Sequence, residues 1–151
     1  MALLVAGIGN LFLGDDGFGV EVLRRLSQRR LPDGVRAVDF GIRGVDLTYA
    51  LLEEWEAAIF VDATPRGAEP GTIYVIEPRA DGPPSLEAHA MDPARVLSLA
   101  RELGRVPSLL RVVGCEPATV EEGIGLSPAV EAAVEPAIAK IEELISELRH
   151  A

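Results

Sequence analysis

An apolar run that passes directly into a glycine-rich, acidic loop opens the chain. Residues 3–6 are all apolar, and residues 7–19 read Gly-Ile-Gly-Asn-Leu-Phe-Leu-Gly-Asp-Asp-Gly-Phe-Gly. Four apolar residues without alternation are typical of a strand covered on both faces, which indicates a parallel sheet with helices above and below it. Open α/β sheets bind ligands at the carboxyl ends of their strands, so the loop after this run is expected at the functional edge.

The rest of the chain alternates short apolar runs with segments of helical periodicity. Further strands are predicted at residues 35–39, 58–61, 72–77 and 109–113, and helices at 18–29, 44–54, 92–103 and 127–148. The connection 63–71 is too short and too rich in proline and glycine for a crossover helix, so the strand after it is expected to be antiparallel. Pro136 is expected to kink or interrupt the last helix.

These elements predict the fold class. The chain is expected to form a single α/β domain, residues 1–151, because this length is enough for one hydrophobic core. The predicted architecture is a three-layer α/β/α sandwich of about five strands, mostly parallel with one antiparallel strand.

Composition and charge exclude several partners. The net charge of −10, from 24 acidic and 14 basic residues, argues against nucleic acid. No apolar run approaches the roughly 18 residues of a membrane span, so no membrane partner is expected. The single cysteine, Cys115, excludes an internal disulfide, and the N-terminus lacks a signal-peptide pattern, which together predict a cytoplasmic protein. We interpret Cys115 as a small buried residue rather than a nucleophile, because neither histidine is near it in sequence.

Three ionisable residues are candidates for a functional site: Asp16, Asp62 and His89. Two carboxylates and an imidazole suit a borderline divalent metal such as nickel or zinc. Each residue also has a simpler interpretation. Asp16 would be the N-cap of the helix that follows, Asp62 a turn residue, and His89 a solvated histidine in an irregular loop.

The pattern Gly-x-Gly-Asn-x-x-x-Gly-Asp-Asp-Gly-x-Gly resembles the opening of the hydrogenase maturation endopeptidases. Those proteases trim the C-terminal tail of the large subunit of nickel-iron hydrogenases. The sequences Ile-Phe-Val-Asp-Ala around Asp62 and Ser-Leu-Glu-Ala-His-Ala around His89, with segments 114–117 and 125–130, match further landmarks of the family. The resemblance implies a phosphorylase/hydrolase-like fold, endopeptidase activity, and Asp16, Asp62 and His89 as catalytic residues and metal ligands.

The resemblance also implies a mechanism. The protease would lack the usual nucleophile and act on nickel already installed in a nickel-iron hydrogenase large-subunit precursor. Nickel would therefore come from the substrate, although zinc or cadmium could replace it in a crystal. The metal or a neighbouring carboxylate would polarise the scissile carbonyl or activate water, with Asp15 and Asp39 as candidate helpers.

One segment departs from the family pattern. Many relatives have a Gly-Gly-Thr type sequence after the second strand, where this chain has Asp-Phe-Gly-Ile-Arg-Gly at residues 39–44. If this loop helps to select the precursor, the substrate belongs to a different hydrogenase class. Gly41, Arg43 and Gly44 are therefore candidates for contacting it.

Two other functions fit parts of the sequence. A dinucleotide-binding domain is suggested by Gly7 and Gly9 after a strand and by Asp39 after the next one. However, Phe12 occupies the position of the third glycine, and the acidic pair at residues 15 and 16 would repel a pyrophosphate. A non-catalytic nickel-binding accessory protein would use the same three ligands, and the sequence does not separate it from a protease.

Overall fold

A computed structural model describes residues 1–78 and 93–150 of the chain. Its centre is a five-stranded sheet with strand order β2-β1-β3-β5-β4. The strands are β1 (Leu3–Ile8), β2 (Val35–Gly41), β3 (Ala57–Ala63), β4 (Ile73–Ile76) and β5 (Leu109–Cys115). All neighbours pair in parallel except β4 and β5, which are antiparallel. The structure thus confirms the predicted fold class, including the antiparallel strand.

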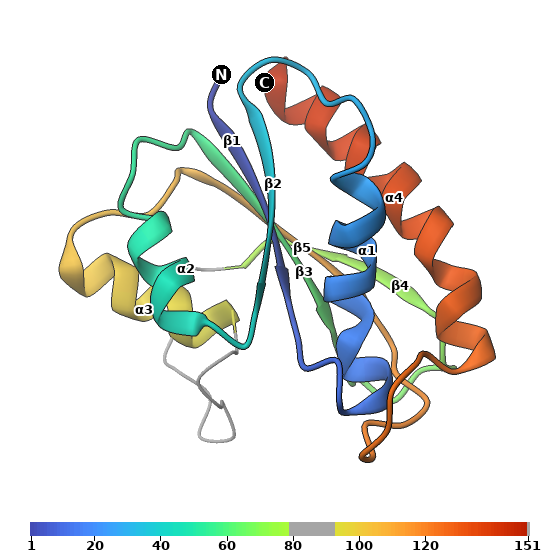
Figure 1. Ribbon diagram of the computed structural model, residues 1–151. Helices are drawn as coiled ribbons and strands as arrows, with labels where there is room; N and C mark the ends of the chain where they lie inside the picture. The colour runs from blue at the N-terminus through green and yellow to red at the C-terminus, as the bar shows by residue number, and fades with distance from the viewer. Residues whose placement is uncertain (79–92, 151) are drawn as a thin grey trace.

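Helices cover both faces of the sheet, as Figure 1 shows. The helices are α1 (Phe18–Leu26), α2 (Gly44–Ala50), α3 (Pro93–Leu103) and α4 (Pro128–Arg149), and a short 3-10 turn, η1 (Gly14–Gly17), precedes α1. α1 and α4 pack on one face, and α2 and α3 on the other. No helix in the described part of the chain is both long and apolar enough to cross a membrane.

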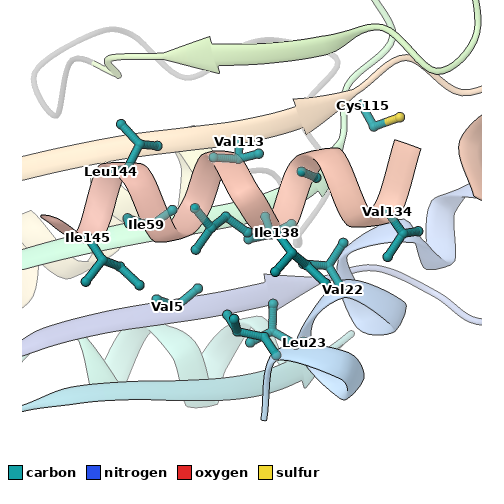
Figure 2. Close-up of a cluster of buried hydrophobic side chains, with 14 of the residues drawn as sticks. Val5, Val22, Leu23, Ile59, Val113, Cys115, Val134, Ile138, Leu144 and Ile145 are labelled. Atoms are coloured by element: carbon teal, nitrogen blue, oxygen red, sulfur yellow. The ribbon is translucent and has the colours of Figure 1, made fainter. Parts of the chain in front are cut away.

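Successive residues of the buried strands enter two separate hydrophobic cores. Val5 and Ile59 belong to the core beneath α1 and α4, whereas Leu4 and Phe60 belong to the core beneath α2 and α3. Figure 2 shows the first core, where Val134, Ile138, Leu144 and Ile145 of α4 lie over the strands. Burial of both faces explains why the strands read as continuous apolar runs.

Two helices differ from their predicted extent. α1 ends at Leu26 and α2 at Ala50, each several residues earlier than predicted. The predicted interruption at Pro136 is wrong, because α4 continues through it from Pro128 to Arg149. Pro136 is exposed while Val134 and Ile138 are buried, so the ring lies on the solvent side and the packed face of the helix stays regular.

Candidate functional site

Asp16 and Asp62 come together at the carboxyl edge of the sheet. β1 and β3 are neighbours, and Gly7 pairs with Val61, so the loop after β1 starts beside Asp62. From β1 the chain passes through α1 to β2, which pairs with one edge of β1, while β3 pairs with the opposite edge of β1. This is a topological switch point, the place where open α/β sheets form ligand-binding crevices.

Close packing of α1 brings Asp16 to this edge. A Cβ atom at Gly19 would lie 2.3 Å from the carbonyl oxygen of Val61 and 2.4 Å from that of Ile8. Only glycine allows the helix backbone to approach both strands this closely. The start of α1, and η1 before it, are therefore held directly over the ends of β1 and β3.

A pocket of about 220 Å³ lies between the two carboxylates. Asp16 and Asp62 both line it, and both are partly buried. The other lining residues come from the end of β3 and from three loops: Leu13, Ala63, Pro65, Pro117 and Val120. Carboxylate oxygens in a small, partly enclosed pocket are suited to bind a divalent cation.

Asp16 does not act as the helix cap that the sequence also allowed. The N-cap of α1 is Gly17, and no side chain caps either α1 or η1. The Asp16 Oδ2 instead accepts a hydrogen bond of 2.9 Å from the Asn10 backbone N–H, which ties it to the preceding part of its own loop.

Asp15, its neighbour, is fully buried and faces a different loop. Its carboxylate accepts hydrogen bonds from the backbone N–H groups of Ala118, Thr119 and Ser127 and from the Ser127 hydroxyl. Burial alone would raise the pKa of Asp15, but these hydrogen bonds outweigh it and hold the pKa below its usual value. Ser127 occupies the N-cap of α4, but its hydroxyl donates a hydrogen bond to Asp15 instead of capping the helix.

Glu116 is a second buried carboxylate near the pocket. Its Oε1 accepts hydrogen bonds from the Tyr74 hydroxyl at 2.6 Å and from the backbone N–H groups of Arg66 and Ala68. The Tyr74 hydroxyl, and then the Arg66 N–H, lower the pKa of Glu116 against the effect of burial. Glu116 thereby holds the turn after β3, which supplies Pro65 to the pocket.

Of the three predicted substrate-contacting residues, Gly41 lines a second pocket of about 220 Å³, whereas Arg43 and Gly44 do not. Gly41 and Asp39 line it together with Phe12 and Ile42, whose side chains are strongly exposed. The Arg43 guanidinium donates hydrogen bonds to the backbone carbonyls of Asp39 and Phe40.

Two predicted residues of this loop have backbone roles. Gly44 is buried at the start of α2. The Asp39 Oδ1 accepts a hydrogen bond from the Gly41 N–H at 2.8 Å. Asp39 lines the second pocket and not the pocket of Asp16 and Asp62.

His89, the third predicted ligand, falls outside the described residues. Within residues 1–78 and 93–150, no three histidine, cysteine or acidic side chains cluster as a metal site would require. The structure thus brings two of the three predicted ligands together, and the metal site as a whole stays a prediction.

Cys115 lies at the buried end of β5 beneath α4 (Figure 2). Burial, with the nearby charges of Asp15 and Glu116, raises the pKa of its thiol to about 11. A thiol with this pKa is protonated at neutral pH and is a poor nucleophile. The interpretation of Cys115 as a buried packing residue is consistent with this environment.

Sequence reasoning missed the apolar surface around both pockets. Among the exposed apolar side chains, Leu11, Phe12 and Ile42 line the second pocket and Val120 lines the first. A signal existed in the sequence, because Leu11 and Phe12 are apolar residues in a loop between glycines, where they have no strand or helix to bury them.

Comparisons with known proteins agree on one family. A family model described as hydrogenase maturation protease matches residues 20–144. The hydrogenase 2 maturation protease of Escherichia coli K12 is 35% identical over 155 residues, covering 99% of this chain and 92% of the relative. The hydrogenase expression/formation protein HupM of Azotobacter chroococcum is 38% identical, covering 91% of this chain and 68% of the relative. The solved structure of the hydrogenase maturating endopeptidase HybD from E. coli matches with a TM-score of 0.85 and 33% identity, over 97% and 93% of the two chains.

Proposed function

Because this chain belongs to the hydrogenase maturation protease family, it is a peptidase that processes the C-terminus of a hydrogenase large subunit, and we propose that it recognises nickel bound in that precursor. The observation that carries the proposal is the shared pocket of Asp16 and Asp62 at the switch point of the sheet. The protease names of the matched relatives favour cleavage over the alternative of a non-catalytic nickel-binding accessory protein.

In the proposed mechanism, nickel enters as part of the substrate. Asp16 and Asp62 would supply carboxylate ligands to it, and His89 would supply an imidazole. Binding of the metal would hold the C-terminal tail of the precursor at a fixed position relative to the pocket. The nickel would then polarise the scissile carbonyl or lower the pKa of a water molecule that attacks it.

This arrangement makes metal loading the basis of specificity. A precursor without nickel would lack the central contact with Asp16 and Asp62, so it would bind weakly and would not be positioned for cleavage. Premature removal of the tail, before the metal is in place, would thereby be avoided. We also propose a cytoplasmic location, which the single, buried and reduced Cys115 supports.

The test is the intact mass of a nickel-iron hydrogenase large-subunit precursor after incubation with this protein. Nickel-loaded and nickel-free precursor are compared with the wild type and with Asp16→Asn, Asp62→Asn and His89→Ala. Loss of one C-terminal peptide only from the loaded precursor, and only with the wild type, is the expected result. Asp33→Asn is the matched control, because Asp33 is exposed in the turn before β2, beside the start of β1 at the opposite end of the sheet.

Two results would contradict the proposal. Equal rates on loaded and nickel-free precursor would show that nickel is not recognised. Full activity of both Asp16→Asn and Asp62→Asn would show that the pocket between them is not the active site.

A further inference from the structure

The buried carboxylate of Asp15 joins two loops that are more than 100 residues apart in the sequence. Its Oδ1 accepts the Ser127 N–H at 2.7 Å, and its Oδ2 accepts the Ser127 hydroxyl and the Ala118 N–H at 2.8 Å each and the Thr119 N–H at 3.2 Å. Among residues 1–78 and 93–150, no lysine or arginine forms an ion pair with it. Every donor therefore comes from the segment between β5 and α4.

Backbone hydrogen bonds continue this junction on both sides of Asp15. The Asp15 N–H donates to the Thr119 carbonyl and the Gly14 N–H to the Gly123 carbonyl, both at 2.9 Å. The Gly123 N–H in turn donates to the Phe12 carbonyl at 2.8 Å. In Figure 1 the two loops lie together at the end of the sheet that carries the pocket.

Both of the joined loops line the pocket that contains the two candidate ligands. Leu13 and Asp16 line it from the loop after β1, and Pro117 and Val120 line it from the loop after β5. Asp15 lies between Leu13 and Asp16 in the first segment, and its carboxylate contacts the second segment. The position of Asp16 relative to Asp62 therefore depends on the contacts that Asp15 makes.

We propose that Asp15 is a positioning residue for the peptidase reaction, which locks the loop carrying Asp16 against residues 117–127 and so fixes the geometry of the pocket. This inference rests on the proposed function of Asp16 and Asp62. In this role Asp15 holds the loop in place and does not itself activate water.

Both the burial of Asp15 and its hydrogen bonds argue against direct contact between its carboxylate and the substrate. Its side chain has no exposed surface, and both of its oxygens already accept hydrogen bonds. A substrate could reach it only if the two loops separated. Asp16, in contrast, is partly exposed and lines the pocket itself.

Substitution with asparagine tests the junction with little change in side-chain size. An amide has only one accepting oxygen, so the NH₂ group of Asp15→Asn would face N–H donors where the wild type has a carboxylate oxygen. The hydrogen bonds on that side of the junction would be lost. Ser127→Ala removes only the hydroxyl donor and keeps the backbone contact. Ser127→Thr restores a hydroxyl, and Asp33→Asn controls for the loss of an acidic charge elsewhere.

Two measurements are made on each folded variant: kcat and KM for cleavage of the nickel-loaded precursor, and hydrogen–deuterium exchange of residues 10–17 and 117–127. For Asp15→Asn we expect kcat to fall by about tenfold to 100-fold, more than KM rises, because misplaced catalytic groups cost mainly the chemical step. Exchange in both segments should accelerate as the loops separate. Ser127→Ala should show smaller changes in the same direction, and Ser127→Thr and Asp33→Asn should behave as wild type.

Three outcomes would overturn the inference. A wild-type kcat for Asp15→Asn would show that the junction does not position the site. A lost kcat with unchanged exchange would show that Asp15 takes part in the chemistry directly. If Asp15→Asn fails to fold, a wild-type kcat for Ser127→Ala despite faster exchange would contradict the role. Asp16→Asn is measured alongside these variants. If Asp16→Asn is fully active, the proposed function itself fails; if it is inactive, a failure concerns only the role of Asp15.

Discussion

Gly9 lies against the backbone of Asp16, so closely that a Cβ atom at Gly9 would be 2.0 Å from the Asp16 carbonyl oxygen. Gly9 also has a φ of 147°, which side chains rarely adopt. The loop after β1 therefore folds back on itself at Gly9, and this fold places Asp16 beside the end of β3. The first glycines of the sequence serve backbone packing rather than the binding of a pyrophosphate.

Gly9→Ala is therefore expected to displace Asp16 and to destabilise the protein by more than the unfavourable φ alone would. Overpacking against a backbone atom, added to the unfavourable φ, should cost about 3 kcal/mol or more in the free energy of unfolding. Gly123→Ala is the control, because Gly123 has a similar φ of 155° but no atom within 4 Å of an added Cβ. Urea denaturation should show a loss of about 1 kcal/mol for Gly123→Ala. Equal losses in the two variants would contradict the role of close packing.

Glu116 should make the stability of the protein depend on pH. Its pKa is lower in the folded state than in the unfolded chain, so its contribution is complete above about pH 5 and is lost as pH falls through the folded pKa. Glu116→Gln keeps an oxygen for the three donors but removes the charge. The difference in Tm between wild type and Glu116→Gln should therefore be largest near neutral pH and shrink below about pH 4.

Tyr74→Phe provides the matched control for that experiment. It removes the strongest single contributor to the low pKa of Glu116 and leaves the ring in place. The pH at which stability is lost should move upward in this variant, because the folded pKa of Glu116 rises. A Tm difference between wild type and Glu116→Gln that is constant from pH 3 to pH 7 would refute the linkage.

Local patterns predicted the sheet and one edge of the site, because they depend on burial and chain geometry. The runs at residues 3–6 and 58–61 are buried on both faces, and the short connection 63–71 does lead to the antiparallel β4. The sequence alone could place Asp16 and Asp62 near each other, because Asp16 follows β1, Asp62 lies at the carboxyl end of β3, and neighbouring parallel strands end at one edge of a sheet. The break predicted at Pro136 failed because packing of the buried face of α4 outweighs the loss of one hydrogen bond at a proline on the solvent side.

The contacts of Asp15 and Glu116 could not be predicted in this way. Asp15 binds residues 118–127, and Glu116 binds Arg66 and Ala68, and no local spacing relates the partners. In the sequence, two adjacent aspartates look chemically alike. The fold makes them different, since it buries Asp15 between two loops and leaves Asp16 at the pocket.

Arg43 is expected to contribute to binding of the precursor, as the departure of residues 39–44 from the family pattern suggests. Its side chain is 58% exposed, and its sequence neighbour Ile42 lines the second pocket together with Phe12. Arg43→Ala should raise KM for the precursor about tenfold, with little change in kcat, because the contact would lie away from Asp16 and Asp62. Arg36→Ala, at an exposed position of the same strand region, should leave KM unchanged. An unchanged KM in Arg43→Ala would remove Arg43 from the recognition surface.

Pro136 offers a route to a more stable protein, because α4 carries this proline in its interior without a break. A proline in a helix removes a backbone hydrogen bond and crowds the preceding turn, at a cost of about 3 kcal/mol relative to alanine. Pro136→Ala should therefore raise the free energy of unfolding by about 1–3 kcal/mol, the lower values applying if the helix bends to relieve the crowding. Pro128→Ala is the control, since Pro128 is at the first position of the same helix, where proline is favourable; it should lower stability slightly. If denaturation in urea shows no gain for Pro136→Ala, the proline is not a source of strain in α4.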